Sequence, residues 1–118
     1  MVKKVVFIVI TLVALTACEK YSYEPVVIDS SIPVSFATEV QPVFTKTCIG
    51  CHGGGRKPDL RVENSYESLL SNEFITTDTT QTESSRLYEM ITVGHKSLTS
   101  DIEKQTIINW MKQGAKNN

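Results

Sequence analysis

The sequence predicts a small domain of the all-α class. Four stretches of the chain carry apolar residues at helical spacing, and three of these stretches have the cap residues that typically bound helices. No stretch alternates apolar and polar residues for long enough to indicate a β-sheet. The chain has 118 residues, of which 41% are hydrophobic and 21% are charged, so its length and composition suit one globular domain.

The first 17 residues are expected to be an export signal that is removed. Lys3 and Lys4 precede an uncharged, mostly apolar run over residues 5–17. This run is shorter than the about 20 residues that a membrane-spanning helix needs. It fits the apolar core of a secretory signal, and a buried helix is the alternative interpretation.

The end of this run, Leu15-Thr16-Ala17-Cys18, resembles the lipobox of bacterial lipoproteins. The resemblance implies cleavage before Cys18 and acylation of both its thiol and its new amino group. Two or more acyl chains anchor a protein stably where one chain is marginal. The mature chain is therefore expected to be lipid-anchored to a bacterial membrane, facing the periplasm or the cell exterior, where disulfides can also form.

Residues 18–34 are expected to form the lipidated cysteine and a flexible tether, and residues 35–118 the folded domain. The tether segment contains Pro25 and Pro33 and has no helical apolar period. Asp29, Ser30 and Ser31 within it favour turns.

The first helix is predicted at about residues 36–47, with a possible break at Pro42, which cannot donate a backbone hydrogen bond. The segment either kinks there or becomes regular only after the proline. Its apolar face comprises Phe36, Val40, Val43, Phe44 and Thr47.

The second helix is predicted to begin at Asn64, with Glu67 completing a capping box. It is expected to bury Tyr66, Leu69 and Leu70. Residues 76–82, of which five of seven are threonine, are expected to form a loop because threonine is a poor helix former.

The third helix is predicted to follow Thr82 and to end at Gly94, a residue type typical of the position just after a helix. The fourth is predicted to begin at Ser100, with Glu103 in a capping box, and to stop at Gly114. The apolar residues of these two helices are Leu87, Met90 and Ile91 in the third and Ile102, Ile107, Ile108, Trp110 and Met111 in the fourth.

Cys48-Ile49-Gly50-Cys51-His52 is a C-x-x-C-H motif. On a helical turn, thiols two residues apart can both reach the vinyl groups on one edge of a porphyrin, and the next residue can direct its imidazole at the iron. The motif therefore predicts one covalent haem c attached to Cys48 and Cys51, with His52 as the proximal axial ligand. A structural disulfide, a thioredoxin-like redox pair and a zinc site that includes His95 are the alternatives, but only haem uses all the positions.

Residues 40–115 resemble small class I c-type cytochrome domains of bacterial lipoproteins. The resemblance implies about four helices around one haem, with the first and last helices crossing. It also implies that the Pro58 carbonyl accepts a hydrogen bond from His52 and that Leu60 covers the haem edge. The matching motifs are the C-x-x-C-H motif, Val43-Phe44, Gly53-Gly54-Gly55, Pro58-Asp59-Leu60, Ser84-Ser85-x-Leu87-Tyr88, Trp110 and Gly114-Ala115.

The distal axial ligand is where the sequence departs from this family, whose usual ligand is a methionine in the loop before the last helix. Residues 95–99 contain no methionine. His95 lies in this loop and is the expected distal ligand, with Met90 as the alternative. Met90 and Met111 both fall on predicted apolar helix faces, which favours a core role for them.

The expected function is electron transfer between extracytoplasmic redox proteins, without enzymatic activity, because a haem with two strong ligands has no open iron position. A five-coordinate haem sensor or peroxidase-like enzyme is one alternative. A structural lipoprotein with a disulfide is another. The formal net charge of −1 gives no basis for nucleic-acid binding.

Lipidation is tested by metabolic labelling. Labelled palmitate should enter the wild-type protein and should not enter Cys18→Ser, because the variant lacks the thiol that accepts the acyl chain. Equal labelling of both proteins, or a mature N-terminus at any other residue, would contradict the prediction.

Overall fold

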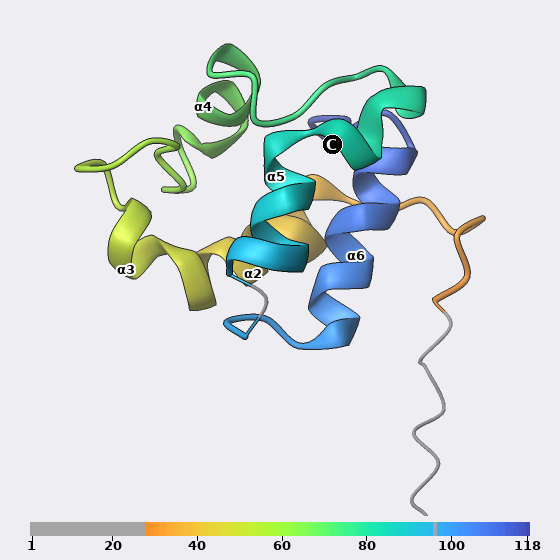
Figure 1. Ribbon diagram of the computed structural model, residues 1–118, viewed down its shortest axis with the longest axis horizontal. Coiled ribbons are helices and arrows are strands. Elements are labelled where there is room, and N and C mark those ends of the chain that lie inside the picture. Colours follow the sequence, from red (N-terminus) through yellow and green to blue (C-terminus); the bar gives the residue numbers. More distant parts are fainter. Residues whose placement is uncertain (1–27, 96) are drawn as a thin grey trace, which may run out of the picture.

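The computed structural model describes residues 28–95 and 97–118. This part of the chain consists of helices and connecting turns with no strand, which confirms the all-α class (Figure 1). The expected signal, Cys18 and the tether up to residue 27 lie outside the described residues. Within the described ranges, no helix combines the length and the hydropathy needed to cross a bilayer.

The first helical run is continuous from residue 36 to residue 52 and is longer than predicted. It comprises η1 (Phe36–Val40), α2 (Gln41–Val43), η2 (Phe44–Cys48) and α3 (Ile49–His52), where η1 and η2 are π-helical. Pro42 sits in the first turn of α2, where a residue without an N–H is tolerated. The wider π-helical turns on both sides carry the helix past the proline to the C-x-x-C-H motif.

Helix α4 (Ser65–Ser71) begins after Asn64 as predicted, but the capping box is wrong. The Asn64 amide donates to Asp59 Oδ2 at 2.9 Å, so a tertiary partner takes the side chain away from the helix end. Leu69 is fully buried and Tyr66 is half-buried, whereas the expected burial of Leu70 is wrong, since it is 39% exposed.

Residues 79–94 also differ from the prediction. The expected loop contains η3 (Thr79–Ser84), a 3₁₀ helix whose first turn is capped by Asp78 accepting from the Thr80 N–H. The next run, α5 (Arg86–Glu89) and η4 (Met90–Gly94), begins after Ser85 rather than Thr82. Gly94 belongs to η4 and His95 follows it as the cap, so the described chain has five helical runs instead of four.

Helix α6 (Asp101–Lys112) agrees with its prediction at both ends. Ser100 and Glu103 form the expected capping box. Gly114 adopts a φ of +94°, which residues with a Cβ rarely adopt. Ile107, Trp110 and Met111 are buried, and Ile102, at the edge of the predicted face, is 51% exposed.

The expected packing of the first and last helices is observed. The Phe36 ring lies 5.1 Å from the Trp110 ring and 5.4 Å from the Tyr66 ring, measured between centroids. Phe44 is 1% exposed and completes this aromatic cluster from the next turns of the first helical run. Such pairs contribute about 0.5–1.5 kcal/mol each beyond the area that they bury.

The segment before the first helix makes hydrogen bonds to the C-terminal part of the chain. The Gln113 side-chain amide donates to the carbonyls of Ser30 and Ile32, and its oxygen accepts from the Val34 N–H at 2.8 Å. The Asn118 side-chain oxygen accepts from the Phe36 N–H at 2.9 Å. Residues 30–34 are therefore hydrogen-bonded to the C-terminal part of the domain, and the expected boundary of the tether at residue 34 stays a prediction.

Glu103 connects the first helical run to α6 and should make stability sensitive to acid. The Lys46 ammonium donates to the Glu103 carboxylate at 2.9 Å, and Ser100 adds two further hydrogen bonds. Together they lower the pKa of Glu103 to about 2. Folding thus favours the ionised form of Glu103. Its contribution to the free energy of unfolding is present above the unfolded-state pKa of about 4.3 and is lost as the pH falls toward 2.

We expect Glu103→Gln to lower the free energy of unfolding at neutral pH by about 1 kcal/mol or less. The difference between the variant and the wild type should shrink between pH 4.5 and pH 2. Urea unfolding at several pH values measures this, with the exposed Glu63→Gln as the control. Parallel pH profiles for wild type and Glu103→Gln would contradict the prediction.

Candidate functional site

The C-x-x-C-H motif ends the first helical run. Cys48 closes η2, and α3 carries Ile49 to His52 in one helical turn. Cys48 is half-buried and Cys51 is exposed, and both are free thiols. Burial raises the pKa of the Cys48 thiol, and the nearby Glu103 carboxylate adds to this effect. The two thiols thus lie one helical turn apart at the surface, as the motif predicts.

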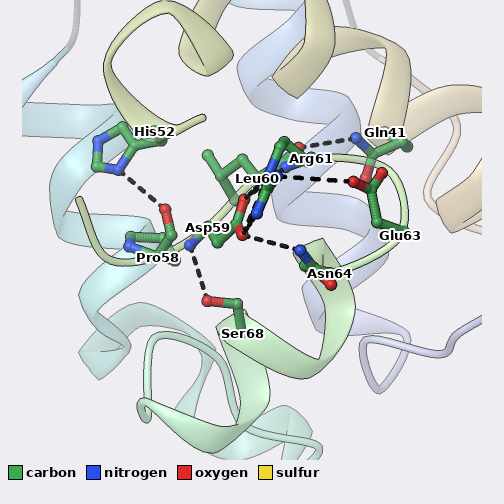
Figure 2. Close-up of polar contacts among 9 residues, drawn as sticks. All are labelled: Gln41, His52, Pro58, Asp59, Leu60, Arg61, Glu63, Asn64 and Ser68. Carbon is green, nitrogen blue, oxygen red and sulfur yellow. Dashed lines mark hydrogen bonds and ion pairs between the residues drawn. The ribbon is translucent and has the colours of Figure 1, made fainter. Parts of the chain in front are cut away.

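His52 is oriented by the loop that follows it. Its Nδ1 lies 3.1 Å from the Pro58 carbonyl oxygen (Figure 2). A carbonyl oxygen only accepts, so Nδ1 carries the proton and donates, and Nε2 keeps its lone pair. This is the contact that the cytochrome resemblance implied. A hydrogen bond of this kind orients a metal-binding histidine and raises its basicity.

His95, from a distant part of the sequence, faces His52. It is the cap residue that follows η4, and its side chain is exposed. The ring centroids of His52 and His95 are 6.4 Å apart, with an angle of 49° between the ring planes. Two imidazoles on opposite sides of one metal ion, each bound at about 2 Å, have ring centres roughly 6 Å apart. The separation of the two ring centres therefore matches that of two imidazoles bound to one metal ion.

The backbone of Leu60 is hydrogen-bonded to the backbone of His52 and to the side chain of Gln41. Its N–H donates to the His52 carbonyl at 2.8 Å, and the Gln41 side-chain amide donates to its carbonyl at 3.0 Å. The Leu60 side chain is 4% exposed. The loop between His52 and α4 thus presents an apolar residue and one carbonyl acceptor to the histidine side of the domain.

Met90 and Met111 occupy different environments. Met111 is 2% exposed, and its sulfur accepts a hydrogen bond from the Ser85 hydroxyl at 3.7 Å, so it belongs to the core as predicted. Met90 is only half-buried, and its sulfur lies close to Gly94, the residue that precedes His95. Met90 is thus near the distal side and stays the alternative ligand.

A buried polar network around Asp59 was not predicted as part of the site. The Asp59 carboxylate accepts from Arg61 Nε and Nη2 at 3.0 and 2.7 Å and from Asn64 Nδ2 at 2.9 Å. The Arg61 guanidinium is the main reason why the pKa of Asp59 lies well below its usual range. Ser68 and Gln41 are also buried here. A short Asp-x-Arg spacing was visible in the sequence, but nothing there indicated the burial of Ser68 and Gln41.

The alternatives for the motif concern the same cysteine and histidine side chains. Cys48 and Cys51 form no disulfide. No group of three or more histidine, cysteine, aspartate or glutamate side chains suited to hold a metal ion occurs in the described ranges. The arrangement that is present consists of two free thiols and two facing imidazoles, and this donor set suits a covalently attached haem. Comparisons with protein-family models, with curated proteins and with solved structures found no match for this chain.

Proposed function

We propose that this chain is a single-haem c-type cytochrome, tethered to a membrane by lipid on Cys18, that carries electrons between extracytoplasmic redox proteins. The observation that carries the proposal is the pair of facing imidazoles, of which one, His52, belongs to a C-x-x-C-H motif. The electron-carrying group is haem c, which gains and loses one electron at its iron.

Each functional residue has a separate role in this proposal. Cys48 and Cys51 would hold the haem through their sulfur atoms. His52 and His95 would bind its iron through their imidazole nitrogens. The Pro58 carbonyl keeps the proton of His52 on Nδ1, and so leaves Nε2 free to bind the metal. With both axial positions taken by protein, no position is left for a substrate, which favours an electron carrier over an enzyme.

A five-coordinate haem sensor or peroxidase-like enzyme is the second candidate, and one observation favours it. His52 is half-buried and bonded to Pro58, whereas His95 is exposed and follows the last turn of η4. A ligand held less firmly than its counterpart is the one that an external molecule displaces.

Covalent attachment is the first test of the proposal. When the chain is expressed with a cytochrome c maturation system, the haem should stay with the protein through acidic acetone extraction, because thioether bonds survive this treatment. The double variant of Cys48 and Cys51 to Ser should lose all covalent haem. Haem that extracts freely from the wild type, or attachment that survives in the double variant, would overturn the proposal.

Ligation by His95 is the second test. The oxidised wild-type protein should be low-spin and lack the near-infrared sulfur–iron band of methionine ligation. Its reduction potential should lie below that of a His/Met haem, because methionine raises the potential. His95→Ala should become largely high-spin and bind carbon monoxide readily, while the helical fold survives.

Met90→Leu is the matched control, because it removes the alternative ligand and should leave the spectrum unchanged. A methionine band in the wild type that disappears in Met90→Leu but not in His95→Ala would assign the distal position to Met90. High-spin haem in the wild type would instead favour the five-coordinate alternative.

A further inference from the structure

We propose that Ser68, on α4, is a positioning residue for His52: it holds the peptide group that carries the Pro58 carbonyl, and so aims that carbonyl at His52 Nδ1. The inference rests on the proposed function, in which His52 is an axial ligand. Ser68 does not contact His52, and it acts through one intervening peptide group.

The argument begins with the planarity of the peptide bond. The Pro58 carbonyl and the Asp59 N–H belong to the same peptide group, and in a trans peptide these two bonds point in opposite directions. The Asp59 N–H donates to Ser68 Oγ at 2.8 Å, and the Pro58 oxygen accepts from His52 Nδ1 at 3.1 Å. In Figure 2 the two dashed lines leave this peptide group on opposite sides. Fixing the N–H end on α4 therefore fixes the direction of the carbonyl end.

Pro58 cannot supply this control itself. It has no N–H, so no hydrogen bond from its own nitrogen can orient it. The Asp59 N–H is the nearest donor that can, and the Ser68 hydroxyl that receives it is buried, with Ser68 6% exposed. A rotation of the peptide group would break the bond to Ser68 and the bond to His52 together, and it would leave polar groups without partners, which is unfavourable.

Helix α4 holds Asp59 at a second point as well. Asn64 and Ser68 are four residues apart, and side chains at this spacing lie on one face of a helix. Asn64 Nδ2 donates to the Asp59 carboxylate at 2.9 Å, while Ser68 receives the Asp59 N–H. This explains why Asn64 is not available to cap α4. Arg61 also donates to this carboxylate, with Nη2 at 2.7 Å from the same oxygen, Oδ2, that Asn64 contacts.

The experiment compares Ser68→Ala with Ser65→Ala in the full chain as purified. Ser65 is a matched control because it is also buried on α4 and also loses a side-chain hydrogen bond, but its partner is the Gln41 side chain. Two properties are measured. One is the exchange rate of the His52 Nδ1 proton by nuclear magnetic resonance. The other is the reduction potential of the haem.

Ser68→Ala should accelerate exchange of the Nδ1 proton by about tenfold, because the Pro58 carbonyl no longer holds it. It should also raise the reduction potential, because a weaker hydrogen bond makes the imidazole less basic and stabilises the oxidised iron less. Ser65→Ala should lower the unfolding midpoint in urea but leave the exchange rate and the potential at the wild-type values. Ser68→Thr, which retains the hydroxyl, should restore slow exchange.

A Ser68→Ala protein that unfolds more readily but keeps wild-type exchange and potential would overturn the inference, because Ser68 would then be only structural. If Ser68→Ala does not fold, Ser68→Cys replaces it, since sulfur is close in size and a weak acceptor. An unchanged exchange rate of the His52 Nδ1 proton in Ser68→Cys would likewise overturn the inference. Absence of covalent haem from the wild type would overturn the proposed function, and the exchange comparison would then still test whether Ser68 aims the Pro58 carbonyl, because it concerns hydrogen bonds within the chain.

Discussion

The antiparallel crossing of the first helical run on α6 is the interaction on which the site depends. Phe36, at the start of the first run, packs on Trp110 near the end of α6. Lys46, further along the first run, pairs with Glu103 in the first turn of α6. The two helices thus run in opposite directions along each other. His52, at the end of the first helical run, therefore lies beyond the point where this run contacts the first turn of α6.

The same crossing explains why two histidines far apart in the sequence meet. His52 follows Lys46 by less than two helical turns, and His95 precedes the Ser100 cap of α6 by one short loop. Both therefore lie at the end of the helix pair where α6 begins. Gln113 and Asn118 close the opposite end by binding the segment before the first helix. In Figure 1 that orange segment leaves the domain on the side away from α3.

Sequence reasoning succeeded where a feature depends on neighbours in the chain. Ser100 and Glu103 are three residues apart, and no tertiary partner replaces either of them in the capping box. The same pattern failed at Asn64, because its amide nitrogen donates to the charged Asp59 carboxylate and this bond orients the side chain, so that its oxygen does not cap α4. The 3₁₀ helix over residues 79–84 was not predicted, because the high threonine content indicated a loop and the capping side chain of Asp78 was not considered. Burial of Ser68 and Gln41 depends on what the loop between His52 and α4 packs against, which no local pattern reveals.

The surrounding structure holds His52 more firmly than it holds His95, and this difference bears on function. His52 sits at the end of a 17-residue helical run, with its carbonyl bonded to Leu60 and its ring bonded to Pro58. Behind Pro58, Asp59 donates its N–H to Ser68 and accepts from Asn64 and Arg61, which leaves the Pro58 carbonyl little freedom. His95 is exposed and begins a loop. An electron carrier with this architecture would keep its proximal side constant through oxidation and reduction, and any change of ligand would take place at His95.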